Sequence, residues 1–199
     1  MGRAQAATQP AAAQPGATAR PGAAQPAPHH IGWFARNGGK TVINLRGEQT
    51  FGTRWLQERA CARHGLRLVD IRLRSRDAPT REELKDIRTL LTSVDYPILV
   101  HCKSGADRAG LMSVMVEHGH NAKPIREARR QLSIKYGHFR NADTGVLGYV
   151  FDRYVADANV RPMPFWDWVD TIYDRDEINR TFKASGWSNR LVNSVLRRE

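Results

Sequence analysis

The stretch Val-His-Cys-Lys-Ser-Gly-Ala-Asp-Arg-Ala-Gly, residues 100–110, decides the interpretation of this 199-residue chain. It follows the apolar run Pro97–Val100, which predicts a central strand, and it precedes a segment with a helical pattern at about 109–118. In a tight loop between a strand and a helix, consecutive backbone N–H groups turn inward and the helix adds its positive end. We therefore expect the loop from Cys102 to Arg108 to bind phosphate.

Two side chains of this loop, Cys102 and Arg108, have the chemistry for phosphoryl transfer. Arg108 can fold back and hold two phosphate oxygens with its planar guanidinium group. The thiolate of Cys102 can attack the bound phosphorus and form an intermediate that water hydrolyses. Gly105 allows backbone angles that a side chain would oppose, and His101 is expected to order the loop through hydrogen bonds. The remaining loop residues expected at the bound phosphate are Lys103, Ser104, Ala106 and Asp107.

Strands and helices alternate along the chain, which predicts an α/β layer architecture. The first 28 residues are mostly Ala, Gln, Pro, Gly and Thr, and the first large apolar residue after Met1 is Ile31. Such a segment cannot bury enough surface to offset its ordering entropy. We expect a disordered tail over 1–29, a single domain over 30–160 and a helical extension over 161–199. Strands are expected at 41–45, 68–73 and 97–100, and helices at 53–64, from 80 onward, and at 109–118, 124–135 and 145–157.

The last forty residues have a different sequence pattern. Apolar and aromatic residues repeat there at helical spacing, at Phe165, Trp168, Val169 and Ile172. The simpler interpretation is a helical hairpin that packs on the domain. The alternative is a basic, aromatic surface that touches a membrane or a lipid substrate, with Trp187–Arg198 as its second amphipathic segment.

The formal net charge of +11 favours polyanionic partners, but it does not choose among phosphorylated substrates, anionic membranes and nucleic acid. We expect no specific nucleic-acid binding, because no stacking motif accompanies the charge. Two cysteines and the lack of a secretory signal or an apolar span make a cytoplasmic location the expectation, with peripheral membrane association as the alternative. We expect the chain to be a monomer. The histidine pairs lack ligand spacing, so no metal site is expected.

These motifs resemble the protein tyrosine and dual-specificity phosphatases. The likeness rests on Cys102 to Arg108, on Thr-Val-Ile-Asn-Leu-Arg-Gly-Glu at 41–48, which resembles a first core strand and turn of the atypical bacterial and fungal group, and on Arg-Asp-Ala-Pro at 76–79, which resembles its acid loop. It covers roughly residues 31–157. The resemblance implies one phosphatase domain with a central, largely parallel sheet flanked by helices, and phosphomonoester hydrolysis through a cysteinyl phosphate without metal or cofactor.

Two aspartates are candidates for the general acid that protonates the leaving oxygen. Asp77 lies roughly 25 positions before Cys102, in the loop where the family usually keeps its acid, and it is the first choice. Its structural alternative is a helix N-cap. Asp107, within the phosphate loop, is the second choice, and its alternative role is to stabilise the loop.

One departure from the family is Ala109, where relatives commonly carry a Ser or Thr that helps to break down the intermediate. It keeps open a catalytically weak, phosphate-binding module. Lys103 adds a second positive charge at the loop mouth, which in this superfamily is typical of enzymes that act on lipid or inositol phosphates. We therefore expect a phosphorylated lipid or another polyanionic phosphomonoester as substrate, with phosphotyrosine protein as the alternative.

Overall fold

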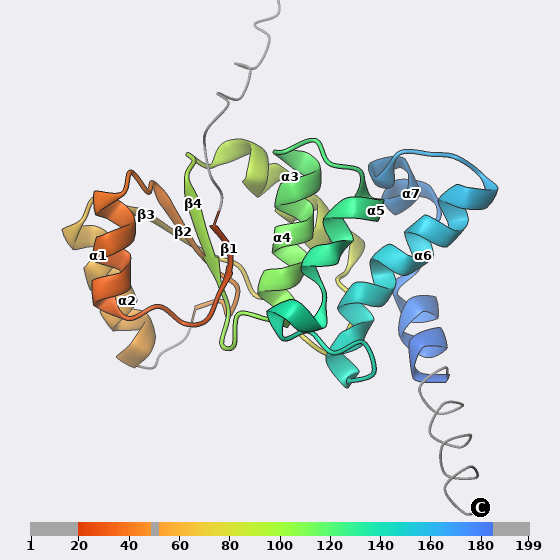
Figure 1. Ribbon diagram of the computed structural model, residues 1–199, viewed down its shortest axis with the longest axis horizontal. Helices are drawn as coiled ribbons and strands as arrows, with labels where there is room; N and C mark the ends of the chain where they lie inside the picture. Colours follow the sequence, from red (N-terminus) through yellow and green to blue (C-terminus); the bar gives the residue numbers. More distant parts are fainter. Residues whose placement is uncertain (1–19, 49–51, 185–199) are drawn as a thin grey trace, which may run out of the picture.

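The computed structural model describes residues 20–48 and 52–184. Its sheet has four parallel strands in the order β1-β4-β2-β3 (Figure 1). Three of them confirm the expected strands, and all carboxyl ends meet at one edge, where ligands bind in open parallel sheets. The strands are β1 Arg20–Ala23, β2 Thr41–Asn44, β3 Arg67–Asp70 and β4 Ile98–His101.

Helices cover both faces of the sheet, which confirms the α/β architecture (Figure 1). The side chain of Val42 packs in a cluster with α1 and α2, whereas its neighbour Ile43 packs in the larger cluster with the other helices. This alternation follows from the two-residue period of a strand. One layer holds α1 Pro28–Arg36 and α2 Gly52–Arg63; the other holds α3 Arg81–Ser93, α4 Asp107–Gly119, α5 Ile125–Ala128, α6 Val146–Val160 and α7 Phe165–Thr171.

Helix α3 begins with a capping box at Thr80. The Thr80 hydroxyl accepts a hydrogen bond from the Glu83 backbone N–H, and the Glu83 carboxylate accepts one from the Thr80 N–H. The expected apolar face of this helix is buried. Because Thr80 is the cap, the N-cap alternative for Asp77 is wrong.

The tail expected over 1–29 needs a correction within the described residues. Arg20–Ala23 forms the edge strand β1, paired with β4, and Pro28 already begins α1. The lack of large apolar side chains led to the wrong prediction of disorder for these residues. An edge strand is held by backbone hydrogen bonds and needs no large side chain. Residues before 20 lie outside the described part of the chain.

The helix expected over 124–135 is also wrong beyond its first turn. Helix α5 ends at Ala128, and two short 3₁₀ turns follow, at Arg129–Gln131 and Ile134–Tyr136. Leu132 lies between them and is buried against Gly110 of α4. Burying Leu132 there breaks the helix, so tertiary packing overrides local helix propensity.

The C-terminal aromatic residues belong to the core. Phe165 and Trp168 of α7 are buried in the main cluster, and the Trp168 indole N–H donates to Asp157 Oδ2 at 2.7 Å. A further helix covers 175–184. The packed hairpin thus holds over this part, and the alternative of an aromatic surface made by residues 165–172 is wrong; Trp187–Arg198 lies outside the described residues. None of the helices described here is long and apolar enough to span a membrane.

Candidate active site

The loop between β4 and α4 has the geometry of an anion site. Cys102 follows the last residue of β4 and is buried, and the Gly105 N–H donates to its sulfur at 3.2 Å. Asp107 then begins α4, so the loop closes on the N-terminus of a thirteen-residue helix. An inward amide beside the sulfur and a helix N-terminus behind it provide donors for a phosphate oxygen.

The N-terminal segment supports one side of this loop. The Cys102 N–H donates to Ala23 O and the Gln25 N–H donates to Lys103 O, both at 3.3 Å. Gly105 has a φ of +82°, and a Cβ atom built on it would lie 2.6 Å from Ala24 N. The glycine is therefore required twice, by the left-handed backbone and by the close approach of this segment. Sequence reasoning missed this support because alanines carry no signal.

The charged residues of the loop lie at its mouth and in the first turn of α4. Arg108 is half-buried, and its Nη1 lies 3.5 Å from Leu45 O, just beyond the carboxyl end of β2. Lys103 and Ser104 are exposed, whereas Ala106 is buried. Ala109, directly after the arginine, is fully buried. Because it is an alanine, this helix turn offers no hydroxyl group at that position.

His101 is buried directly before the cysteine. Its Nδ1 lies 3.3 Å from Cys102 O, and its Nε2 lies 2.5 Å from the side-chain nitrogen of Gln57 in α2. Burial lowers the pKa of His101 to about 4, so the ring is neutral near pH 7. A neutral ring that donates from Nδ1 to Cys102 O can accept from the Gln57 amide, which suits the supporting role expected for His101.

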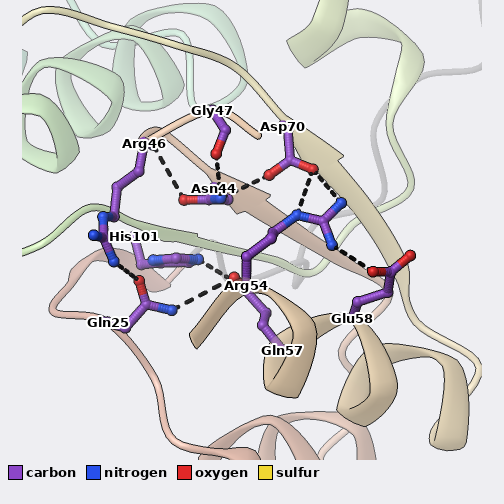
Figure 2. Close-up of polar contacts among 9 residues, drawn as sticks. All are labelled: Gln25, Asn44, Arg46, Gly47, Arg54, Gln57, Glu58, Asp70 and His101. Atoms are coloured by element: carbon purple, nitrogen blue, oxygen red, sulfur yellow. Dashed lines mark hydrogen bonds and ion pairs between the residues drawn. The ribbon is translucent and has the colours of Figure 1, made fainter. Parts of the chain in front are cut away.

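Gln57 belongs to a wider polar network beneath the loop, shown in Figure 2. Its amide oxygen lies 3.5 Å from Gln25 Nε2, and the oxygen of Gln25 accepts from Arg46 Nη1 at 2.8 Å. These bonds join α2 to the N-terminal segment that supports the phosphate loop. Sequence analysis singled out neither glutamine, because nothing in their local pattern shows that they meet.

A second part of the network ties α2 to the strand ends. Arg54 donates from Nε and Nη2 to Asp70 Oδ2 at 3.0 and 2.7 Å, and Asp70 Oδ1 accepts from Asn44 Nδ2 at 2.6 Å (Figure 2). The Arg46 backbone N–H in turn donates to Asn44 Oδ1 at 3.1 Å. The carboxyl ends of β2 and β3 and helix α2 are thereby held together next to His101.

Asp107 has an interaction partner that sequence analysis did not assign. Its Oδ1 lies 2.8 Å from Nδ1 of His138, whose side chain is fully buried while that of Asp107 is 18% exposed. The other ring nitrogen of His138 is buried with no hydrogen-bond partner among the described residues. Only the glycine of Tyr-Gly-His at 136–138 signals the turn that brings this histidine inward, since Gly137 has a φ of +78°.

Asp77 lies in the loop before α3 with a side chain that is 34% exposed. Its Oδ2 is 3.8 Å from Arg74 Nη1 and 3.9 Å from Arg175 Nη2, and among the described residues its side chain makes no other ion pair or hydrogen bond. Arg175 also donates from Nε to Ala78 O at 2.9 Å, and Asn179 Oδ1 accepts from the Ala78 N–H at 2.9 Å. The structure thus joins Asp77 to the C-terminal helix and not to the phosphate loop.

Within residues 20–48 and 52–184, no group of three or more His, Cys, Asp or Glu side chains is arranged to hold a metal ion.

Comparison with known proteins gives a family match and several similar structures. Residues 7–141 match the family model described as "DSP-PTPase phosphatase fused to NAD+ Kinase". Similar solved structures include TpbA of P. aeruginosa (18% identity, 81% of this chain and 84% of that chain, TM-score 0.48). PTPMT1 (18% identity, 71% and 94%, TM-score 0.48) and the active form of Tk-PTP (17% identity, 70% and 90%, TM-score 0.48) are similar as well. No curated protein matches the sequence.

Proposed function

The chain belongs to the family of DSP-PTPase phosphatases fused to NAD+ kinase, and we propose that this cysteine-dependent phosphatase hydrolyses phosphomonoesters through a phosphate bound covalently to Cys102. The observation that supports the assignment is the loop itself, in which a backbone N–H lies 3.2 Å from the Cys102 sulfur and Arg108 follows at the start of α4. In this proposal the guanidinium group of Arg108 turns toward the phosphate that the thiol and the inward amide contact.

In the proposed reaction, the thiolate of Cys102 attacks phosphorus, a sulfur–phosphorus bond forms, and the bond from phosphorus to the leaving oxygen breaks. A general acid gives its proton to the leaving oxygen. Water then attacks the cysteinyl phosphate, the same carboxylate takes a proton from that water, and inorganic phosphate and the thiolate result. Arg108 and the loop amides stabilise the charge on the equatorial oxygens in both steps.

Of the two candidates for the acid, Asp107 is the better supported by the geometry. It belongs to the phosphate loop and directly precedes Arg108. An ionised carboxylate beside a bound phosphate dianion is electrostatically unfavourable. In the proposed reaction a proton on Asp107 removes that repulsion and is then given to the leaving oxygen.

Asp77, the first choice from the sequence, becomes the second candidate. Its carboxylate faces Arg74 and Arg175, and it would have to leave both guanidinium groups to reach a leaving oxygen in the phosphate loop. Both contacts are close to 4 Å and partly exposed, so this rearrangement is energetically small. A side-by-side comparison of the two aspartates therefore decides the assignment.

For the substrate, we propose a phosphorylated lipid or another polyanionic phosphomonoester, with phosphotyrosine protein as the alternative. The exposed Lys103 in the same loop as Arg108 and the net charge of +11 support a substrate with more than one negative charge. Ala109 supports a different function, a phosphate-binding module with weak turnover, because the hydroxyl that assists the second step is missing.

The test is hydrolysis of a small aryl phosphate in the presence of EDTA, with the wild type compared with Cys102→Ser, Asp77→Asn and Asp107→Asn. We expect turnover that survives EDTA, is lost in Cys102→Ser, and falls sharply in Asp107→Asn but little in Asp77→Asn. The reverse order of the two aspartates would reassign the acid. A wild type without turnover that still binds phosphate or vanadate would favour the binding module.

A further inference from the structure

Three large apolar side chains project from the segment between α5 and α6, residues 129–141, which we call the 129–141 loop. Ile134 is 75% exposed, Phe139 57% and Tyr136 46%. They lie within six residues of one another. Isolated apolar residues are common on protein surfaces, but such a group in one loop is typical of an interaction site.

The exposure of these side chains is built into the loop. Leu132 and His138 are buried on the inner side, and Ser133 O accepts from the Tyr136 and His138 N–H groups at 2.9 and 3.1 Å. The left-handed Gly137 turns the chain between these anchors. Because the inner positions are occupied, Ile134, Tyr136 and Phe139 point outward in a folded, hydrogen-bonded turn.

The charges of the 129–141 loop are all of one sign, with four basic residues and no acidic one. Arg129 and Arg140 both bind Asp152 of α6. Arg130 and Lys135 are exposed, and neither has an acidic partner in the part of the chain that the structure describes. Two cations without an acidic partner among the described residues thus lie beside the exposed apolar side chains, and Lys135 Nζ is 5.5 Å from the centre of the Tyr136 ring.

The surface is hollowed where these residues meet α6, with a volume of about 860 Å³. The walls include Arg130, Lys135, Tyr136 and Phe139, together with Gly148 of α6. Basic and aromatic side chains therefore face the same concave surface, which suits a ligand with an anionic head and an apolar body.

The 129–141 loop lies directly against the phosphate loop. His138 contacts Asp107, and a Cβ atom built on Gly137 would be 3.5 Å from the side chain of Ala106. In Figure 1 the segment between α5 and α6 turns at the same end of α4 at which the phosphate loop enters that helix. A partner that binds the 129–141 loop would therefore lie next to the expected phosphate site.

We propose that the 129–141 loop docks the protein on an anionic phospholipid surface. Apolar side chains that enter the headgroup region and basic side chains that contact anionic lipids are the two elements of interfacial binding, and this loop carries both. This membrane binding is a property separate from the proposed reaction, because it can be measured in the absence of any phosphatase activity. Together with that reaction, it would bring lipid phosphomonoesters to Cys102 from the plane of the membrane.

The experiment is co-sedimentation of the full chain with vesicles of phosphatidylcholine alone and of phosphatidylcholine with about one third phosphatidylglycerol. We expect the wild type to bind the anionic vesicles. In the double variant Ile134→Ser, Phe139→Ser the partition coefficient should fall by a factor of roughly ten or more. Val160→Ser is the matched control, because Val160 is 89% exposed at the end of α6. Thermal melting of each variant shows that the fold is retained.

A second double variant, Arg130→Ala, Lys135→Ala, separates charge from apolar contact. It should bind more weakly and depend less on salt than the wild type. The proposal is overturned if the wild type ignores anionic vesicles, or if the Ile134, Phe139 variant binds as the wild type does, since the overall charge would then account for binding. A wild-type dimer that dissociates in that variant, seen by light scattering, would overturn it too, because a second copy would cover the loop.

Discussion

Nδ1 of His138 lies 2.8 Å from Oδ1 of Asp107, so a residue 31 positions further along the chain fixes the carboxylate that precedes Arg108. When the His138 Nδ1–H donates a hydrogen bond to Oδ1 of Asp107, the other carboxylate oxygen, Oδ2, is left to carry the proton of the general acid. The imidazole is fully buried and cannot reach substrate itself. We therefore regard His138 as a positioning residue for Asp107.

Replacing His138 with Leu should lower kcat/KM, which reports the first chemical step, by roughly tenfold to a hundredfold for an aryl phosphate with a poor leaving group, such as phenyl phosphate. The loss should be much smaller for dinitrophenyl phosphate, because that leaving group departs without protonation. His138→Asn is the matched control, since its side-chain amide places an N–H near the position of Nδ1 and should restore part of the rate. Equal losses on both substrates would mean that His138 only supports the fold.

Changing Gly105 to Ala should disrupt phosphate binding, because the new Cβ would lie 2.6 Å from Ala24 N in a left-handed backbone. We expect kcat/KM to fall at least tenfold, together with the loss of the thermal stabilisation that phosphate gives. Gly119→Ala, at the end of α4, meets nothing within 4 Å and serves as the control. Unchanged protection by phosphate in Gly105→Ala would show that the N-terminal segment does not restrict the loop.

The buried His101 predicts a dependence of stability on pH. The pKa of His101 is about 4 in the fold, whereas a histidine exposed to water has a pKa of 6.5, so the unfolded chain binds more protons between these values. The stability gained from the neutral ring is full above pH 6.5 and is lost as pH falls toward 4, by at most about 3 kcal/mol. Urea unfolding at pH 7 and pH 4.5 should therefore show a smaller decrease in His101→Asn than in the wild type. Equal decreases would mean that other groups cause the effect.

Ala109 predicts that the second chemical step is slow. Rapid mixing of the wild type with an aryl phosphate should give a burst of phenol followed by a slower steady state, because the cysteinyl phosphate accumulates. Ala109→Ser should reduce the burst and raise the steady-state rate. Serine is preferred to threonine because Ala109 is fully buried and a larger side chain would overpack the core. A wild type without a burst would mean that hydrolysis of the intermediate is not limiting.

The sequence could predict the parts of this molecule that depend on local pattern. The apolar run before Cys102, the spacing to Arg108 and the periodic face of α3 each follow from a few neighbouring residues. Strand β1 could not be predicted, because its backbone pairing leaves no trace in side-chain hydropathy. Nor could the contacts from Gln57 to His101 and from His138 to Asp107, which join residues 44 and 31 positions apart.

The loop that carries Asp77 shows the same limit over a longer distance. The Tyr173 hydroxyl donates to Pro79 O, and Arg175 and Asn179 bind the backbone of Ala78. These residues belong to the helical extension that was expected to pack on the domain, but the sequence did not indicate that they contact the loop next to Asp77. Their role follows only from the packing of the C-terminal helices on the start of α3.

This attachment bears on how the protein can be shortened. A truncation after Val160 follows the apparent end of the catalytic domain, yet it removes α7 and the three residues that fasten the Asp77 loop, and it uncovers the core around Phe151. Rates measured on such a fragment would describe a phosphatase in which the Asp77 loop has lost its support and part of the core is exposed to solvent. The shortest piece that preserves the native arrangement therefore extends past Asn179.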